Sequence, residues 1–137
     1  TCRTPAQATA VRQALGLTNP QALWVQDTAR GIILAGGKGE FVAELSFNYD
    51  LGIEVELLTV LRGQHWAPNS PLSHIGIHLA DGEEFPVSNA PLLLELETYE
   101  HTNPYLIEKR RTYHYRIYDT RQWLGVCLKY IRKKHGA

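Results

Sequence analysis

The sequence predicts a helix-poor α+β fold in a single domain, and three observations support this. The chain has 137 residues, of which 44% are hydrophobic and 20% are charged, and this suits one domain with a core of its own. A strong helix-start signal stands near the N-terminus. From Leu23 onward, apolar and polar residues alternate with the period of two that is typical of β-strands, which favours mainly antiparallel sheet.

The one helix is expected at residues 5–15. Thr4 supplies the cap, Pro5 presets φ at the first helical position and Gln7 completes a capping box. Gly16 marks the end of the helix. Strands are then expected near residues 23–34, with a bend at 27–30, and at 41–48 and 53–61. The turn Gly36-Gly37-Lys38-Gly39 lacks the Ser/Thr and the following helix of a phosphate-binding loop, so it predicts a hairpin.

A second half is expected to begin after a linker at residues 62–72, which is rich in Pro and Asn. Strands are predicted at 73–79, 92–101, 112–118 and 124–132, and residues 81–91 form an irregular connection. A turn is expected at 119–122, and a basic tail follows at 133–137. The organisation is therefore one domain, 1–137, whose two halves cover residues 1–61 and 73–137.

Charge is distributed unevenly along the chain. Residues 1–100 hold 5 Lys/Arg against 12 Asp/Glu, whereas residues 101–137 hold 9 against 2. Solvated side chains on a C-terminal strand and tail are the simpler interpretation. The alternative is a basic surface for an anionic partner, in which Lys109, Arg110 and Arg111, with tyrosines nearby, would contact nucleic acid.

Other classes of protein are disfavoured by composition. No segment approaches the roughly 18 to 20 apolar residues of a membrane span, and the N-terminus lacks a signal-peptide pattern, so no membrane partner is expected. Cys2 and Cys127 are too few for a disulfide scaffold and favour a reducing, cytoplasmic location. Because methionine is absent, the chain is expected to start after the true first residue. A homodimer is left open.

Four of the predicted strands carry carboxylates or imidazoles on one face and apolar residues on the other. A solvated sheet face explains such alternation, but His mixed with Glu also suggests a ligand-binding surface. We therefore expect these polar faces to lie on one concave side. Their members are Glu54 and Glu56 on 53–61, His74 and His78 on 73–79, Glu95, Glu97 and His101 on 92–101, and His114 and Arg116 on 112–118.

The segment Leu72-Ser73-His74-Ile75-Gly76-Ile77-His78-Leu79-Ala80-Asp81 resembles the opening strand of a module in the vicinal oxygen chelate superfamily. This group includes glyoxalases, bleomycin-resistance proteins and extradiol dioxygenases. The segment Gly52-Ile53-Glu54-Val55-Glu56-Leu57-Leu58 is similar to a closing strand of such a module. The resemblance implies paired βαβββ-like modules that form a cupped sheet. The first module is without its opening strand, which is either lost or supplied by residues before Thr1.

The resemblance also implies a site. It assigns metal-binding roles to His74 and Glu56, with His78, His101 or His114 completing a shell for Zn, Ni, Mn or Fe. Two departures are visible: the first module's histidine has no counterpart, and Lys129 stands where the second module's closing glutamate is expected. Loss of the metal, as in the antibiotic-sequestering members of the group, is therefore an open alternative.

Two functions follow as hypotheses. In the first, the domain acts on a small oxygen-rich substrate through a divalent metal, as an isomerase, lyase or dioxygenase. Glu95 or Glu97 would be the general base, and Arg116 would orient a substrate carboxylate or phosphate. In the second, the domain is not an enzyme and binds an anionic ligand, a protein or nucleic acid through residues 101–137.

Overall fold

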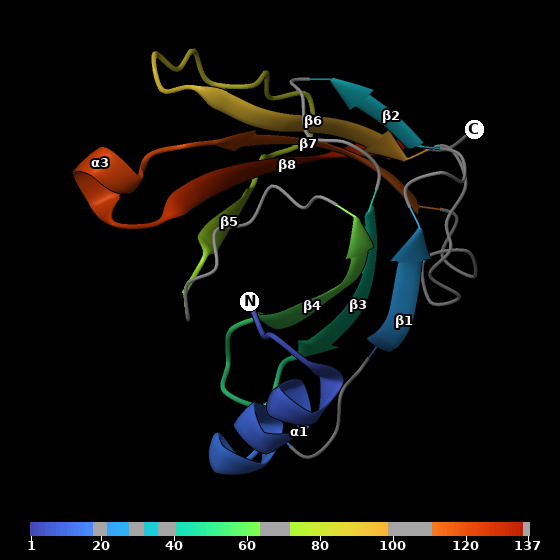
Figure 1. Ribbon diagram of the computed structural model, residues 1–137. Helices are drawn as coiled ribbons and strands as arrows, with labels where there is room; N and C mark the ends of the chain where they lie inside the picture. The colour runs from blue at the N-terminus through green and yellow to red at the C-terminus, as the bar shows by residue number, and fades with distance from the viewer. Residues whose placement is uncertain (18–21, 28–31, 36–40, 64–71, 99–110, 136–137) are drawn as a thin grey trace.

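The computed structural model describes residues 1–17, 22–27, 32–35, 41–63, 72–98 and 111–135 (Figure 1). Strands dominate, and the helix-poor α+β class is confirmed. The elements are α1 (Pro5–Ala14), β1 (Ala22–Asp27), β2 (Ile32–Ala35), β3 (Phe41–Asn48), β4 (Val55–Gly63), β5 (His74–His78), β6 (Leu92–Thr98), β7 (Arg111–Tyr118), α3 (Arg121–Leu124) and β8 (Cys127–His135). No helix among the described residues is long and apolar enough to span a membrane.

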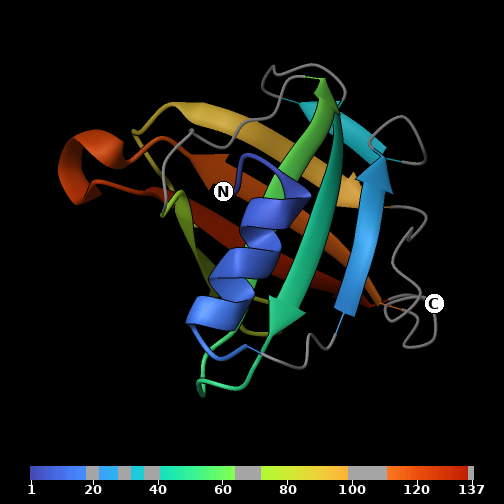
Figure 2. The same ribbon diagram turned by 60° about the horizontal axis from the view of Figure 1, so that its bottom comes forward.

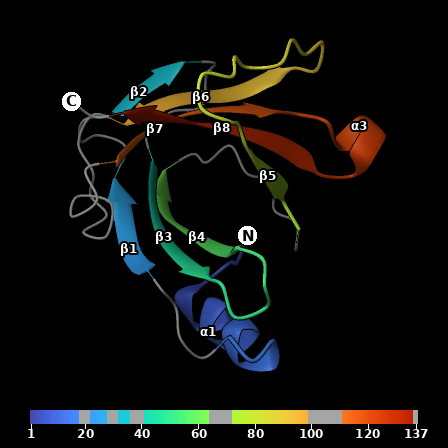
Figure 3. The same cartoon turned by 180° about the vertical axis from the view of Figure 1, so that it is seen from behind.

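The strands form two sheets that face each other, where a single cupped sheet was expected (Figures 1 and 3). The smaller sheet, sheet A, has the order β1-β3-β4, and the larger one, sheet B, has the order β2-β6-β7-β8-β5. All pairs are antiparallel except β5 with β8. The predicted mainly antiparallel pairing is therefore confirmed.

One strand of the first half of the chain joins the sheet that the second half forms. β1 and β2 follow each other in sequence, yet β1 pairs with β3 in sheet A and β2 pairs with β6 in sheet B. The register joins Ile32 to Thr98 and Ala35 to Glu95. β2 thus satisfies backbone groups of β6 that would otherwise stand at an open sheet edge. Sequence periodicity finds both strands but carries no information about which partner each one meets.

Parallel contacts occur once in each sheet. In sheet B, His74 of β5 lies opposite Cys127 of β8, and the two strands run in the same direction. In sheet A, Cys2 makes an isolated parallel bridge to Thr59 of β4, and its backbone N–H donates to the Leu58 carbonyl at 2.7 Å. The chain between Cys2 and β1 contains α1, whereas the connection between β5 and β6 contains no helix.

α1 forms as its cap predicts and covers the outer face of sheet A (Figure 2). The Thr4 hydroxyl accepts a hydrogen bond from the Gln7 backbone at 3.1 Å, and the Gln7 side chain accepts one from the Arg3 backbone at 2.6 Å. Ala8 of the helix is buried, and the Arg12 guanidinium of the helix donates to the Ser46 hydroxyl of β3 at 3.0 Å. The helix ends before Gly16, whose φ of 71° suits glycine.

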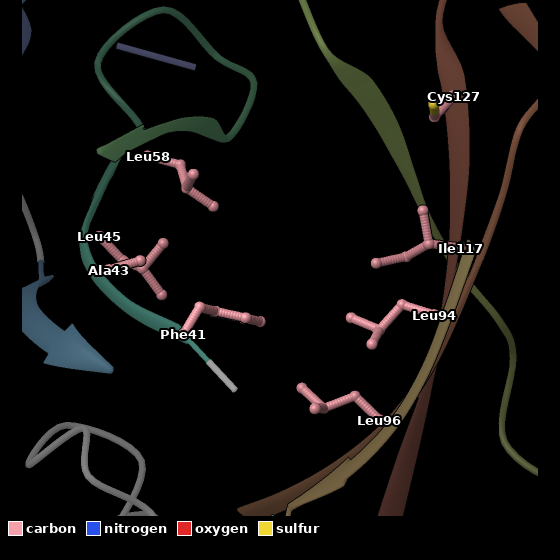
Figure 4. Close-up of a cluster of buried hydrophobic side chains, with 8 residues drawn as sticks. All are labelled: Phe41, Ala43, Leu45, Leu58, Leu94, Leu96, Ile117 and Cys127. Carbon is pink, nitrogen blue, oxygen red and sulfur yellow. The ribbon is translucent and has the colours of Figure 1, made fainter. Parts of the chain in front are cut away.

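The hydrophobic core fills the space between the sheets (Figure 4). Sheet A contributes Phe41, Ala43, Leu45 and Leu58, and sheet B contributes Leu94, Leu96, Ile117 and Cys127. Burying each large side chain stabilises the fold by about 1.5 to 3 kcal/mol. Because strand residues alternate, this core fixes the direction of the polar side chains beside it: Leu94 and Leu96 point inward, and Glu95 between them points outward.

Candidate functional site

A cluster of polar side chains lies on the inner faces of both sheets, beside the hydrophobic core. We call it the inner cluster; its members are Glu56, Ser73, His74, Tyr115 and Lys129. The Glu56 Oε2 atom of sheet A lies 2.9 Å from the His74 Nε2 atom of sheet B. Only 10% of the His74 side chain and 12% of the Glu56 side chain are exposed. This hydrogen bond therefore joins the two sheets in a region with little water.

The inner cluster has a defined hydrogen-bond order. The Ser73 hydroxyl lies 2.9 Å from the His74 Nδ1 atom, on the side of the ring opposite Glu56. When Nε2 of the neutral ring carries the proton and donates a hydrogen bond to the Glu56 carboxylate, Nδ1 accepts a hydrogen bond from the Ser73 hydroxyl. The order resembles a serine–histidine–acid relay, but Ser73 is only 5% exposed. Ser73 is thus placed to orient the ring and not to attack a substrate.

Lys129 and Tyr115 complete the inner cluster. The Lys129 Nζ atom lies 3.8 Å from Glu56 Oε2 and 4.5 Å from the centre of the Tyr115 ring. The lysine side chain is 14% exposed. Burial, followed by the nearby charge of Glu56, raises the pKa of the Tyr115 phenol, so the phenol stays neutral. The ammonium is therefore held between a carboxylate and the negative face of an aromatic ring.

The inner cluster contains some of the residues that the sequence singled out. Glu56 and His74 meet, and Lys129 joins them from β8. His78 lies four residues beyond His74 on the same face, about 13 Å away by strand rise, and its side chain is exposed. The expectation that the His74 and His78 imidazoles contribute to one site is wrong within one chain, because the extended strand β5 holds them too far apart. His101 lies outside the described residues.

Glu95, His114 and Arg116 lie on the opposite face of sheet B, where they form an outer cluster with Phe85. Glu95 Oε2 is hydrogen-bonded by Arg116 Nε and lies 3.5 Å from His114 Nε2. Glu97 lies opposite His114 in the register of β6 and β7. The expected single concave polar side is therefore wrong. Leu94, Leu96 and Ile117 occupy the inner face of the same strands, so their polar neighbours must point outward.

Phe85 comes from the irregular connection between β5 and β6 and covers the outer cluster. Its ring lies 4.8 Å from the His114 ring in an edge arrangement and 4.5 Å from the Arg116 guanidinium. The Arg132 guanidinium lies 5.0 Å from the same ring and donates to Glu84 at 3.0 Å. Phe85 thus anchors this loop on the outer face of sheet B, as α1 covers the outer face of sheet A. The sequence alone does not indicate a role for Phe85, since a lone aromatic residue in a loop carries no periodic signal.

Burial and charge shift the titration of the outer cluster. Burial lowers the pKa of His114, and the nearby guanidinium groups of Arg132 and Arg116 lower it further against the opposing effect of Glu95. For Glu95, burial acts to raise the pKa, but the Arg116 hydrogen bond and charge, with His114, bring it below its usual value. His114 Nδ1 is buried and has no hydrogen-bond partner among the residues that the structure describes. Arg116 is held by Glu95, so it is not placed to orient a substrate at the inner cluster.

The basic C-terminal part offers less free charge than its composition suggests. Lys109 and Arg110 lie outside the described residues, and only the backbone of Arg111 is described. Arg116 pairs with Glu95, Arg121 pairs with Asp119 at 2.7 Å and Arg132 pairs with Glu84. Within the described residues, these three arginines are matched by carboxylates, which weakens the case for a nucleic-acid surface there.

The donor set of the inner cluster does not fit a divalent metal ion. Zinc and similar ions need at least three imidazole, thiolate or carboxylate ligands from the protein. Here the two possible ligands, Glu56 and His74, bond to each other, and the third group is the ammonium of Lys129. No group of three His, Cys, Asp or Glu residues able to hold a metal occurs within the described parts of the chain.

Comparisons of the chain with models of protein families, with curated proteins and with solved structures returned no match.

Proposed function

We propose that the domain is a pair of βαβββ-like modules of the vicinal oxygen chelate type. Two observations support this. In sheet B, the parallel strands β5 and β8 are followed outward by β7 and β6. In sheet A, the parallel bridge of Cys2 to β4 is followed outward by β3 and β1, with α1 as the connection. Both halves then share one connection pattern, and Phe85 in its loop replaces the second helix.

We propose further that the inner cluster binds a small, neutral molecule with oxygen atoms on adjacent carbons. The observation that carries this proposal is the 2.9 Å contact of Glu56 and His74 across the two sheets, with Lys129 at 3.8 Å from the same carboxylate oxygen. The Glu56 carboxylate would accept from a hydroxyl group, while the Lys129 ammonium would donate to a carbonyl oxygen. A nearly buried set of charges adds little net stability to a fold, which favours a functional reason for it.

Lys129 also supplies the positive charge that a metal ion would bring to such a site. Because it replaces a ligand and contacts the remaining carboxylate, we propose that this chain works without a divalent metal. The ammonium would polarise the ligand carbonyl, and Glu56, kept in place by His74 and Ser73, would hold a proton during the reaction.

Calorimetric titration tests the proposal. Dihydroxyacetone, a neutral molecule with adjacent carbonyl and hydroxyl groups, is expected to bind at millimolar or lower concentration, which is about −4 kcal/mol or better. Zn²⁺, Ni²⁺ and Mn²⁺ are expected to bind no more tightly than about 1 mM.

Lys129→Ala should abolish the binding of dihydroxyacetone, and Lys133→Ala, at an exposed position four residues further on, is the matched control. Saturable binding that survives in Lys129→Ala would contradict the assignment of the site. Stoichiometric metal binding by the unaltered chain would return the metal-dependent alternative to first place.

A further inference from the structure

The amine of the Lys129 side chain lies near a proton acceptor and is largely shielded from water. Its side chain is 14% exposed, and its Nζ atom lies 3.8 Å from Glu56 Oε2. A lysine that forms a covalent imine with a carbonyl compound must lose its ammonium proton before the nitrogen can attack, and a carboxylate within reach can accept that proton. An exposed lysine such as Lys133 lacks this combination. The geometry around Lys129 therefore goes beyond what reversible hydrogen bonding to a ligand requires.

We infer that Lys129 forms an imine with the carbonyl group of the bound molecule. This inference rests on the proposed function and narrows its substrate class to aldehydes and ketones that carry an adjacent hydroxyl group.

The first step is a proton transfer between the two side chains. The Lys129 Nζ atom and the Glu56 Oε2 atom are 3.8 Å apart, so the carboxylate is placed to accept the ammonium proton. This transfer leaves a neutral amine beside a neutral acid. His74 donates to the same Glu56 oxygen that faces Lys129, so it fixes the position of the acceptor.

The covalent step then balances with the groups present. The Lys129 nitrogen attacks the carbonyl carbon, a C–N bond forms, and the carbonyl oxygen takes the proton from Glu56. The nitrogen of this carbinolamine returns a proton to Glu56, which passes it to the departing hydroxyl group. Ammonium and carbonyl have become a protonated imine and water, and the Glu56 carboxylate ends in its initial state. No oxidant, reductant or metal is consumed.

Borohydride trapping tests the inference on the whole chain. Hydride from the reagent reduces a protonated imine to a stable secondary amine, and peptide mass spectrometry identifies the lysine that carries it. With dihydroxyacetone as the probe, we expect Lys129 to be labelled at least 10-fold faster than Lys133. Glu56→Gln should slow labelling of Lys129 by at least about 10-fold, because it removes the proton acceptor, and leave Lys133 unchanged.

Two controls keep the result interpretable. Lys129→Arg retains the positive charge but cannot form an imine, so its peptide should carry no label while circular dichroism shows an unchanged fold. Glycerol, which has a hydroxyl group in place of the carbonyl, should compete with labelling without being trapped.

Labelling of Lys129 no faster than that of Lys133 would overturn the inference. If calorimetry shows saturable binding of dihydroxyacetone in that case, the proposed function stands and only the imine is wrong. If the probe is neither bound nor trapped, both proposals fail.

Discussion

The inner and outer clusters contain similar residue types but have different roles. Each pairs a glutamate with a histidine and a cation: Glu56, His74 and Lys129 inside, Glu95, His114 and Arg116 outside. The inner cluster joins two sheets, whereas Glu95, His114 and Arg116 lie on adjacent strands of one sheet under Phe85. The outer cluster thus has a structural purpose, because it anchors the loop that covers sheet B. Among the described residues, the inner cluster holds no comparable loop, and it contains the amine that we assign to chemistry.

The largest effect should come from removing a core side chain between the two clusters. Leu94→Ala removes a side chain that is 1% exposed in the core, and it should lower the free energy of unfolding by about 3 kcal/mol. Leu92→Ala, on the same strand at 38% exposure, should cost less than about 1 kcal/mol. Urea denaturation measures both. Equal losses would mean that burial in the core does not set the contribution of Leu94 to stability.

The next effect compares the two charge pairs directly. A double-mutant cycle with Glu56→Gln and Lys129→Met should give a coupling energy of about 1 kcal/mol, because both side chains are nearly buried. The cycle with Glu95→Gln and Arg116→Met should give about half of that, since these side chains are 26% and 35% exposed. Urea denaturation of the two sets of variants, at one ionic strength, supplies the values. A larger coupling energy for Glu95 and Arg116 than for Glu56 and Lys129 would contradict this expectation.

Acid should weaken the outer cluster in two separate ranges of pH. The folded pKa of His114 lies below its ordinary value of 6.5, so the unfolded chain binds more protons between the two values. The stability from neutral His114 is complete above about pH 6.5 and declines as pH falls below it. The lowered pKa of Glu95 adds stability above about pH 4.5 that is lost at lower pH.

The slope of unfolding free energy against pH checks this. His114→Gln should flatten the slope near pH 6, and Glu95→Gln should flatten it below about pH 4.5. A variant of His114 that keeps the whole slope near pH 6 would show that another group is responsible.

The smallest effect is expected at the rim of the outer cluster. Glu84 is 87% exposed where it meets Arg132, so Glu84→Ala should change the free energy of unfolding by less than about 0.5 kcal/mol. Phe85→Ala, at the neighbouring position, should cost about 2 kcal/mol because it removes a ring that contacts His114 and two guanidinium groups. Thermal unfolding compares them. A loss from Glu84→Ala as large as that from Phe85→Ala would mean that charge, and not the ring, anchors the loop.

The sequence by itself determined the local elements, because their signals lie within a few neighbouring residues. The cap at Thr4 predicts α1, and the strand predicted at 41–48 is β3 at its observed bounds. β4 and β6 were placed to within a few residues. The turn expected at 119–122 is instead the single helical turn α3, which delays the start of β8 to Cys127. Alternation also states correctly which residues of a strand share a face.

Only the tertiary structure decided which of those faces turn toward each other. Alternation puts Leu94 and Leu96 on one face of β6 and Glu95 and Glu97 on the other. In β5 it likewise separates the isoleucines from the histidines, so both strands show the same polar-against-apolar pattern. In β6 the apolar face points inward, because Leu94 and Leu96 meet the core. In β5, at the edge of the sheet, the isoleucines are exposed and His74 points inward to Glu56. The physical reason is that β5 lies at the sheet edge, beside the core, where a polar side chain can be buried if it has a hydrogen-bond partner. For His74 that partner is Glu56 on the other sheet.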